Sequence, residues 1–156
     1  MLISSPAFQD HKSIPTQYAH GGVVGGQNVS LPLEWTDAPP GTQSFALSIV
    51  DPHPVAHDWV HWLAINIPKD TTTLPKAASG SRMPRGSKEI YNSYGELGYG
   101  GPEPPKGSGA HPYIITIYAL NTDDLSLPQN TTLTAFRKSL DGKIIASATL
   151  TGMYER

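Results

Sequence analysis

Hydrophobic residues recur at every second position in three segments of the chain, and this period predicts β-strands. β-Branched and aromatic residues alternate in these segments between turn signals, as they do in strands that pack against a core. The second and third segments are apolar on both faces, so we expect them near the centre of a sheet. The segments are Ser44 to Asp51 (SFALSIVD), Trp59 to Asn66 (WVHWLAIN) and Tyr113 to Leu120 (YIITIYAL), with a weaker candidate at Leu31 to Trp35 (LPLEW).

The same alternation assigns side chains to faces. Asp51 shares a face with the apolar residues of its strand and falls where that strand ends. In the second strand one face is expected to carry Trp59, His61, Leu63 and Ile65, and the other Val60, Trp62, Ala64 and Asn66. His111 shares a face with Tyr113 if the third strand extends back through Pro112, because proline is tolerated at the start of a strand.

One helix is expected, with Thr131 or Thr132 as its N-cap and Gly142 at its end. The segment from Ile144 to Tyr154 fits either a further helical turn or a last strand. A long Gly, Ser and Pro-rich connection with almost no apolar period runs from Ala77 to Ala110, and loops of this length are usually functional or disordered. Its interspersed tyrosines favour a packed, functional loop. No repeat or domain boundary is visible, so residues 1–156 are expected to form one mostly antiparallel β domain.

Composition narrows the class of protein. The chain has 15 glycines and 15 prolines but is still 38% hydrophobic, which indicates many turns around a real core. A net charge of −2 without a lysine or arginine cluster argues against a nucleic-acid partner. No apolar run approaches the roughly 18 residues of a membrane span, and the start lacks a secretory signal. Because cysteine is absent, a reducing compartment suits the chain, and a cytoplasmic location is expected.

Two histidine-containing segments carry the candidate chemistry: DPHPVAHDWVHW at 51–62 and YGGPEPPKGSGAHPY at 99–113. Asp51 and His61 lie on the inward faces of two strands joined by a short link. Gly107, Ser108 and Gly109 offer consecutive backbone amides that can form an anion-binding nest, with His111 directly after them. Imidazole can donate neutral hydrogen bonds or become cationic near physiological pH. The sequence therefore predicts a pocket for an oxyanion, with pH-dependent affinity.

Other interpretations of these residues stay open. His61 could be a core histidine satisfied by a backbone carbonyl. His53, His57 and His61 are spaced by four, which could hold a metal ion, although that spacing suits a helix and this segment has the residues of a turn. Ser108 near His111 could act as nucleophile and base, but no GxSxG elbow, P-loop or orienting third group is apparent. We therefore assign no catalytic residue, no metal ligand and no cofactor, with a metal-binding or weakly hydrolytic protein using His61 and His111 as the alternative.

The order of several motifs resembles the phosphatidylethanolamine-binding protein family, which includes Raf kinase inhibitor protein, and especially its compact bacterial and archaeal members. The motifs are SSPAF, SLPLEW, DP, WVHWLAINIP, NSYGELGYGGPEPPKGSGAHPY and a closing LTGMYER, spread over nearly the whole chain. The resemblance implies a β sandwich around a large antiparallel sheet, with Greek-key connections and one or two short peripheral helices. It also implies binding without catalysis, at one anion pocket, in a protein that is often a homodimer.

Carried over position by position, the pocket contains the family's aspartate, two histidines, a proline and a tyrosine, with a tryptophan wall. With the nest and its neighbours, the expected ligand-binding residues are Asp51, His53, Trp59, His61, Pro105, Gly107, Gly109, His111 and Tyr113. The resemblance implies ligands such as phosphate, acetate, cacodylate-like anions or a phosphoethanolamine headgroup. Because several members inhibit kinases or serine proteases, an enzyme of either kind is a candidate partner.

The chain departs from the family pattern in two places. DPHP followed by Val55 stands where the family has DPDAP, which removes a negative charge and makes the pocket more favourable for anions. HPY stands where the family has HRY, so Pro112 replaces a basic residue. The resemblance further implies a cis peptide bond between His53 and Pro54, an isomer that X-Pro bonds make accessible.

Overall fold

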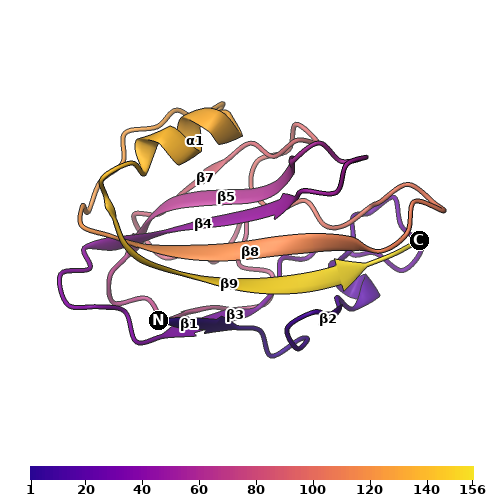
Figure 1. Cartoon of the computed structure of the whole chain (residues 1–156), viewed down its shortest axis with the longest axis horizontal. Helices are drawn as coiled ribbons and strands as arrows, with labels where there is room; N and C mark the ends of the chain where they lie inside the picture. Colours follow the sequence, from indigo (N-terminus) through magenta and orange to yellow (C-terminus); the bar gives the residue numbers. More distant parts are fainter.

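The computed structural model describes residues 1–156 as a sandwich of two β-sheets with one short α-helix (Figure 1). The elements are β1 (Leu2–Ser4), β2 (Lys12–Ser13), the 3-10 helix η1 (Thr16–Tyr18), β3 (Leu33–Thr36), β4 (Ser44–Asp51), β5 (Trp59–Pro68), β6 (Thr73–Leu74), β7 (Lys88–Ile90), β8 (His111–Leu120), α1 (Leu133–Ser139) and β9 (Ile144–Tyr154). The larger sheet has the order β2-β9-β8-β4-β5-β7 and the smaller one β1-β3-β6.

The expected fold class is confirmed, and the three clearest strand predictions form the centre of the larger sheet. β4 pairs with β5 on one side and with β8 on the other, all antiparallel. Because β8 returns beside β4 from far along the chain, the connection is of the kind found in Greek-key sandwiches. The ambiguous last segment is a strand, β9, which pairs along the whole of β8. The long connection from Ala77 to Ala110 contains one short strand, β7, which pairs with β5.

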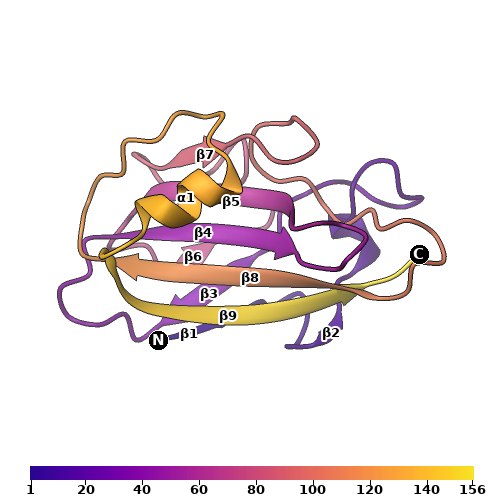
Figure 2. The ribbon, with the colours of Figure 1, turned by 45° about the horizontal axis from the view of Figure 1, so that its top comes forward.

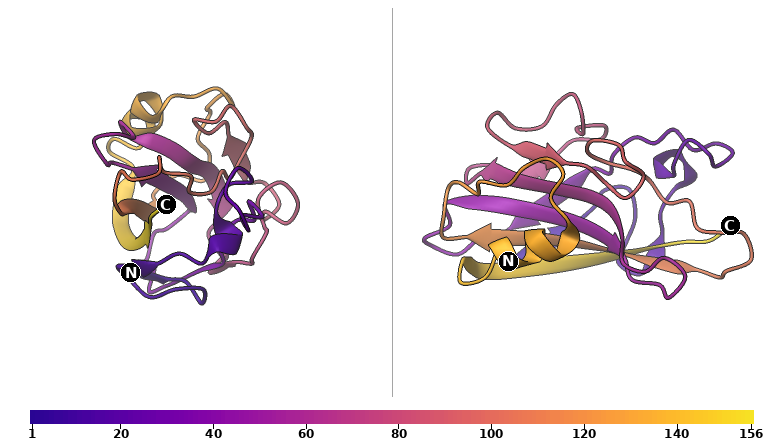
Figure 3. Two further views of the ribbon diagram at one scale, coloured as in Figure 1. Left: turned by 90° about the vertical axis from the view of Figure 1, so that its right-hand side faces the viewer. Right: turned by 90° about the horizontal axis from the view of Figure 1, so that it is seen from above.

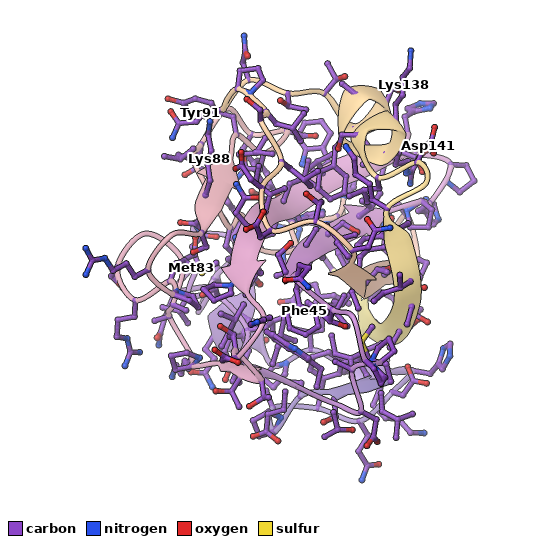
Figure 4. The ribbon with its side chains drawn as sticks, turned by 90° about the vertical axis from the view of Figure 1, so that its left-hand side faces the viewer. Phe45, Met83, Lys88, Tyr91, Lys138 and Asp141 are labelled. Carbon is purple, nitrogen blue, oxygen red and sulfur yellow. The ribbon has the colours of Figure 1, made fainter.

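The main core lies between the two sheets. Phe45, Leu47 and Ile49 of β4 face Leu33 and Trp35 of β3 there, and all are buried. Figure 4 shows Phe45 in this interior. At roughly 25 cal/mol per Å² of buried apolar surface, this layer is the principal stabilising contribution to the fold.

The outer face of the larger sheet is covered by α1 (Figures 2 and 3). Phe136 and Leu140 are buried against Ala46 of β4 and Leu63 of β5, whereas Lys138 lies on the outer side of the helix (Figure 4). The helix begins as expected, because the Thr132 side chain accepts a hydrogen bond from the Ala135 amide. No helix here has the length and apolar character needed to cross a membrane.

A β-bulge in β5 changes the expected faces of this strand. Ile49 pairs with Trp62 and Val50 pairs with Val60, so His61 has no partner on β4. An extra residue of this kind turns two successive side chains toward the same face. Trp62 therefore packs in the core between the sheets, and the ring of His61 contacts Tyr113 on that same side. The simple alternation was wrong here: Val60, Leu63 and Ile65 lie on the outer face, while Trp62, Ala64 and Ile67 lie on the inner one.

Candidate functional site

Three strand ends meet around a cavity of about 220 Å³ at the end of the molecule where the C-terminus lies (Figure 1). β4 ends there, and β5 and β8 begin there, because β4 runs antiparallel to both neighbours. Six of the residues expected at the site line this cavity: Asp51, Trp59, His61, Pro105, His111 and Tyr113. The pairing of strands thus brings together Asp51 and His111, which are 60 positions apart in the chain.

Asp51 and His111 form a buried pair at the base of the cavity. Asp51 Oδ2 lies 2.6 Å from Nδ1 of His111, and both side chains are almost fully enclosed. The second oxygen, Oδ1, accepts the backbone amide of His53 at 2.9 Å. The His53 ring also stacks on the His111 ring, with centroids 3.8 Å apart. Asp51 therefore fixes both the orientation of His111 and the position of the turn after β4.

The other nitrogen of His111 is also in use. Its Nε2 lies 2.8 Å from the Ser108 hydroxyl, and that hydroxyl donates to the carbonyl of Pro105 at 2.6 Å. Because both ring nitrogens have partners within the protein, a ligand could bond to His111 only by replacing one of them. The contribution of His111 to the cavity is therefore the edge and face of a fixed ring.

His61 has one nitrogen free for a ligand. Its Nδ1 donates to the Gly100 carbonyl at 2.7 Å, as the core-histidine interpretation anticipated. Its Nε2 has no hydrogen-bond partner in the protein. This atom is not enclosed either, because the one enclosed side-chain polar atom without a partner is Trp35 Nε1. Since His61 lines the cavity, Nε2 faces that space. Burial lowers the pKa of His61 to about 4, against the opposing influence of the Gly100 carbonyl and Asp51.

Aromatic rings form the walls of the cavity. The ring of Tyr113 meets His61 edge-on, with centroids 4.9 Å apart, and Tyr94 stands beside Trp59 at 5.4 Å. Burial, reinforced by the Asp51 carboxylate, raises the pKa of Tyr113, so its hydroxyl keeps its proton. That hydroxyl has no protein partner and is not enclosed, so it too faces the cavity. The cavity is therefore offered a donor by the Tyr113 hydroxyl and an acceptor by His61 Nε2.

Sequence reasoning missed part of the lining, namely Val55, Ala56, Tyr94, Glu103 and Pro104. Tyr94 and Glu103 belong to a network around His20, whose Nε2 lies 2.8 Å from Glu96 and whose Nδ1 lies 2.9 Å from Glu103. The His20 ring also stacks on Tyr94 at 4.1 Å. These residues come from irregular segments without periodicity, so no sequence pattern indicated that they meet. The packed tyrosines of the long connection were the single available signal.

Three of the expected site residues lie outside the cavity lining. His53 acts through its stacking on His111, while Gly107 and Gly109 do not reach the cavity. The amide of Gly107 donates to the Arg156 carbonyl at 3.1 Å, and that of Ser108 to the Pro105 carbonyl at 3.2 Å. Because two of its amides are taken by carbonyls, the expected anion-binding nest is not formed.

The expected cis bond before Pro54 was also wrong, because every peptide bond is trans. The trans turn is closed by the bond from the His53 amide to Asp51 and by a bond from the Ala56 amide to the His53 carbonyl at 2.8 Å. The histidines spaced by four do not converge, and no group of three or more metal-ligating side chains is present.

Comparisons with known proteins agree with the fold. The family model described as Phosphatidylethanolamine-binding protein matches residues 4–155. A relative named UPF0098 protein, from Methanothermobacter thermautotrophicus, is 37% identical over 157 residues and covers 100% of this chain and 99% of its own. The crystal structure of Escherichia coli YbcL, described as a new member of the mammalian PEBP family, superposes with a TM-score of 0.93 at 32% identity, covering 99% of this chain and 98% of that one.

A more distant structure shares the fold alone. It is a carboxypeptidase Y inhibitor complexed with its cognate proteinase, with a TM-score of 0.58 and 13% identity, covering 99% of this chain and 82% of that one.

Proposed function

Because the chain belongs to the phosphatidylethanolamine-binding protein family, we propose that its cavity binds a small phosphorylated group, such as a phosphoethanolamine headgroup, without transforming it. The observation that carries this proposal is the pair of unpaired polar atoms, His61 Nε2 and the Tyr113 hydroxyl, which open into the same cavity. Neither atom is enclosed, so both are open to a ligand that enters the cavity. A hydroxyl can donate to a phosphate oxygen, and an imidazole nitrogen can accept a hydrogen bond.

Size and lining support a headgroup as the ligand. A cavity of about 220 Å³ lies below the roughly 300–1,000 Å³ of sites for drug-sized molecules, so it suits a small group. The Tyr113 hydroxyl can donate to a phosphate oxygen, and the rings of Trp59 and Tyr94 can cover the organic part. Asp51 is the nearest negative charge, but both of its oxygens already accept hydrogen bonds from the protein.

Titration with phosphoethanolamine, followed by NMR of the histidine and tyrosine side chains, tests this function. Saturable shifts of His61 and Tyr113 are expected. Tyr113→Phe removes the donor and should weaken binding about tenfold, as for the loss of one hydrogen bond of about 1.4 kcal/mol. Tyr118→Phe, on the same strand but facing α1, is the matched control and should bind normally. Absence of any saturable shift at millimolar ligand would overturn the proposal.

A partner enzyme, either a kinase or a serine protease, is the second part of the proposal. The carboxypeptidase Y inhibitor with the same fold supports it. Trp59 and Val55 line the cavity and are also exposed, so they offer apolar area at its mouth that a protein could cover. Dose-dependent inhibition in a panel of purified proteases and kinases, lost in Trp59→Ala, is expected. Full activity of every enzyme at a tenfold molar excess of the protein would count against this part.

The third part of the proposal is that the protein is cytoplasmic and forms a homodimer. Ile144 and Ile145 are exposed at the start of β9, and β2 covers β9 only at Gly152 and Met153. An uncovered strand edge with apolar side chains can pair with another chain. Sedimentation velocity at micromolar concentration should give the mass of two chains, and a single species of one chain would remove this expectation.

Hydrolysis is a second candidate function, because the orienting group that the sequence did not reveal is Asp51. Asp51, His111 and Ser108 are linked by bonds of 2.6 and 2.8 Å in the order used by serine hydrolases. Against this, the Ser108 hydroxyl donates to the Pro105 carbonyl and does not line the cavity. A fluorophosphonate probe that labels the protein, but not Ser108→Ala, would favour an enzyme, whereas an unlabelled protein would exclude an activated Ser108.

A further inference from the structure

The hydrogen bonds around His61 leave its neutral ring without a donor for an oxyanion in the cavity. The Gly100 carbonyl can only accept, so His61 Nδ1 carries the proton and Nε2 of the neutral ring is a bare lone pair. An ionised phosphate or sulfate oxygen also has only lone pairs. Two acceptors that face each other repel, so an ionised phosphate or sulfate oxygen cannot bond to His61 unless a proton lies between them.

We propose that the cavity takes up one proton together with its ligand, shared between His61 Nε2 and a ligand oxygen, and so selects phosphate monoesters over sulfate esters. The inference rests on the proposed binding function and names the ligand class of that same cavity. A phosphate monoester accepts a proton with a pKa near 6, whereas a sulfate monoester remains unprotonated in the neutral range.

The charged residues that line the cavity also favour the uptake of a proton. Asp51 and Glu103 both contribute to the lining, and no lysine or arginine does. A phosphate dianion would therefore meet two carboxylates, with no lysine or arginine in the lining to offset the repulsion. One added proton reduces the ligand to a monoanion and converts the contact with His61 from repulsive to attractive.

The proton must arrive with binding, because the free site does not hold it. The titratable groups that face His61 are Asp51 from β4, Tyr113 from β8, Tyr94 from the long connection and His20 from the segment after η1. Asp51 favours the protonated ring, whereas burial and His20 oppose it, and burial is the largest influence. At pH 7 the ring is neutral before a ligand enters.

Calorimetry can count this proton. Phosphoethanolamine is titrated at pH 7 in buffers of different ionisation enthalpy, and the slope of observed enthalpy against buffer enthalpy gives the protons taken up. About 0.9 proton per site is expected, because roughly nine-tenths of the ligand is a dianion one unit above its pKa. For the same reason, affinity should fall about tenfold between pH 7 and pH 8. Ethanolamine O-sulfate, the matched ligand that cannot carry the proton, should bind at least about tenfold more weakly, which corresponds to 1.4 kcal/mol or more.

His61→Gln provides a second readout, because its amide can donate to an oxyanion without any proton uptake. We expect the uptake to disappear and the preference for phosphate over sulfate to collapse, while His57→Gln, at an exposed position, keeps both. Wild-type binding with no proton uptake and equal affinity for both esters would overturn the inference and leave the proposed function standing. No binding of either ester between pH 6 and pH 8 would overturn the proposed function and the inference together.

Discussion

At the scale of single residues, Asp51 holds the site together. Its two oxygens bond to the ring of His111 and to the backbone amide of His53, and the rings of these two histidines stack on each other. A carboxylate in this enclosed place is stable because both oxygens have donors. The Asp51 carboxylate also raises the pKa of His61, Tyr94 and Tyr113, although burial outweighs it at His61.

Asp51→Asn is therefore expected to lower the free energy of unfolding by about 2–3 kcal/mol, because the amide group turns one donor toward another donor. Urea denaturation at pH 7 measures this loss. The matched control is Asp58→Asn, since Asp58 is half-exposed and only 3.8 Å from the equally exposed Arg137. That change should stay within about 0.5 kcal/mol. Equal stability of the two variants would show that the buried pair does not stabilise the fold.

His61 also makes stability depend on pH. Its pKa is lowered by burial to about 4 in the folded protein, below the roughly 6.5 of an unfolded chain. Between these values the unfolded chain binds more protons, so the stabilisation is present above pH 6.5 and is lost as the pH falls toward 4. From pH 7 to pH 5 the loss attributable to His61 should be about 2 kcal/mol.

The measurement compares urea denaturation at pH 7 and pH 5 for wild type and for His61→Asn, whose amide can still donate to the Gly100 carbonyl. The variant should lose less stability than wild type over this range. His57→Asn, at an exposed position with positive φ that asparagine accepts, should follow wild type. If His61→Asn loses as much as wild type, His61 is not the group responsible.

At the scale of elements, periodicity was a good guide where strands are regular and failed where they are not. β4 and β8 carry an unbroken alternation, and their register is regular from Ser44 to Val50. β5 is interrupted, because the bulge at His61 and a second shift opposite Ala46 each insert a residue. A bulge leaves no trace in a hydrophobic pattern, since it is set by the twist and packing of the neighbouring strands. It is nevertheless the feature that turns His61 toward the cavity.

The helix shows where local chemistry suffices for prediction. Thr132 accepts the Ala135 amide at 3.1 Å, so Thr132→Ala should cost about 1 kcal/mol of stability through the loss of the cap. Thr134→Ala is the matched control, because Thr134 is exposed within the helix and alanine is the better helix former there. Thermal unfolding should place the two variants on opposite sides of wild type, and the same direction for both would contradict the capping role.

At the scale of the whole molecule, the cavity is assembled from parts of the chain that lie far apart. Asp51 ends β4, Tyr94 and Glu103 belong to the long connection, and His111 begins β8. His20, which contacts Tyr94 and Glu103 but does not line the cavity, follows η1. The strand ends could be anticipated from the sequence and the resemblance. The network of His20, Glu96 and Glu103 could not, because it depends on how two irregular segments pack against each other.

Arg156 joins the end of the chain to the proline-rich wall of this cavity. Its Nε donates to the Pro104 carbonyl at 2.7 Å, and its own carbonyl accepts the Gly107 amide. Arg156→Ala removes the first bond, so amides of residues 103–110 should exchange with deuterium several-fold faster, while the global free energy of unfolding changes by less than about 1 kcal/mol. Hydrogen exchange read by mass spectrometry measures both quantities. Arg85→Ala, at an exposed arginine with no ion pair or hydrogen bond of its side chain, is the control and should leave this segment unchanged. Unaltered exchange in Arg156→Ala would mean that the wall is held by its prolines and by the Ser108 contact with His111 alone.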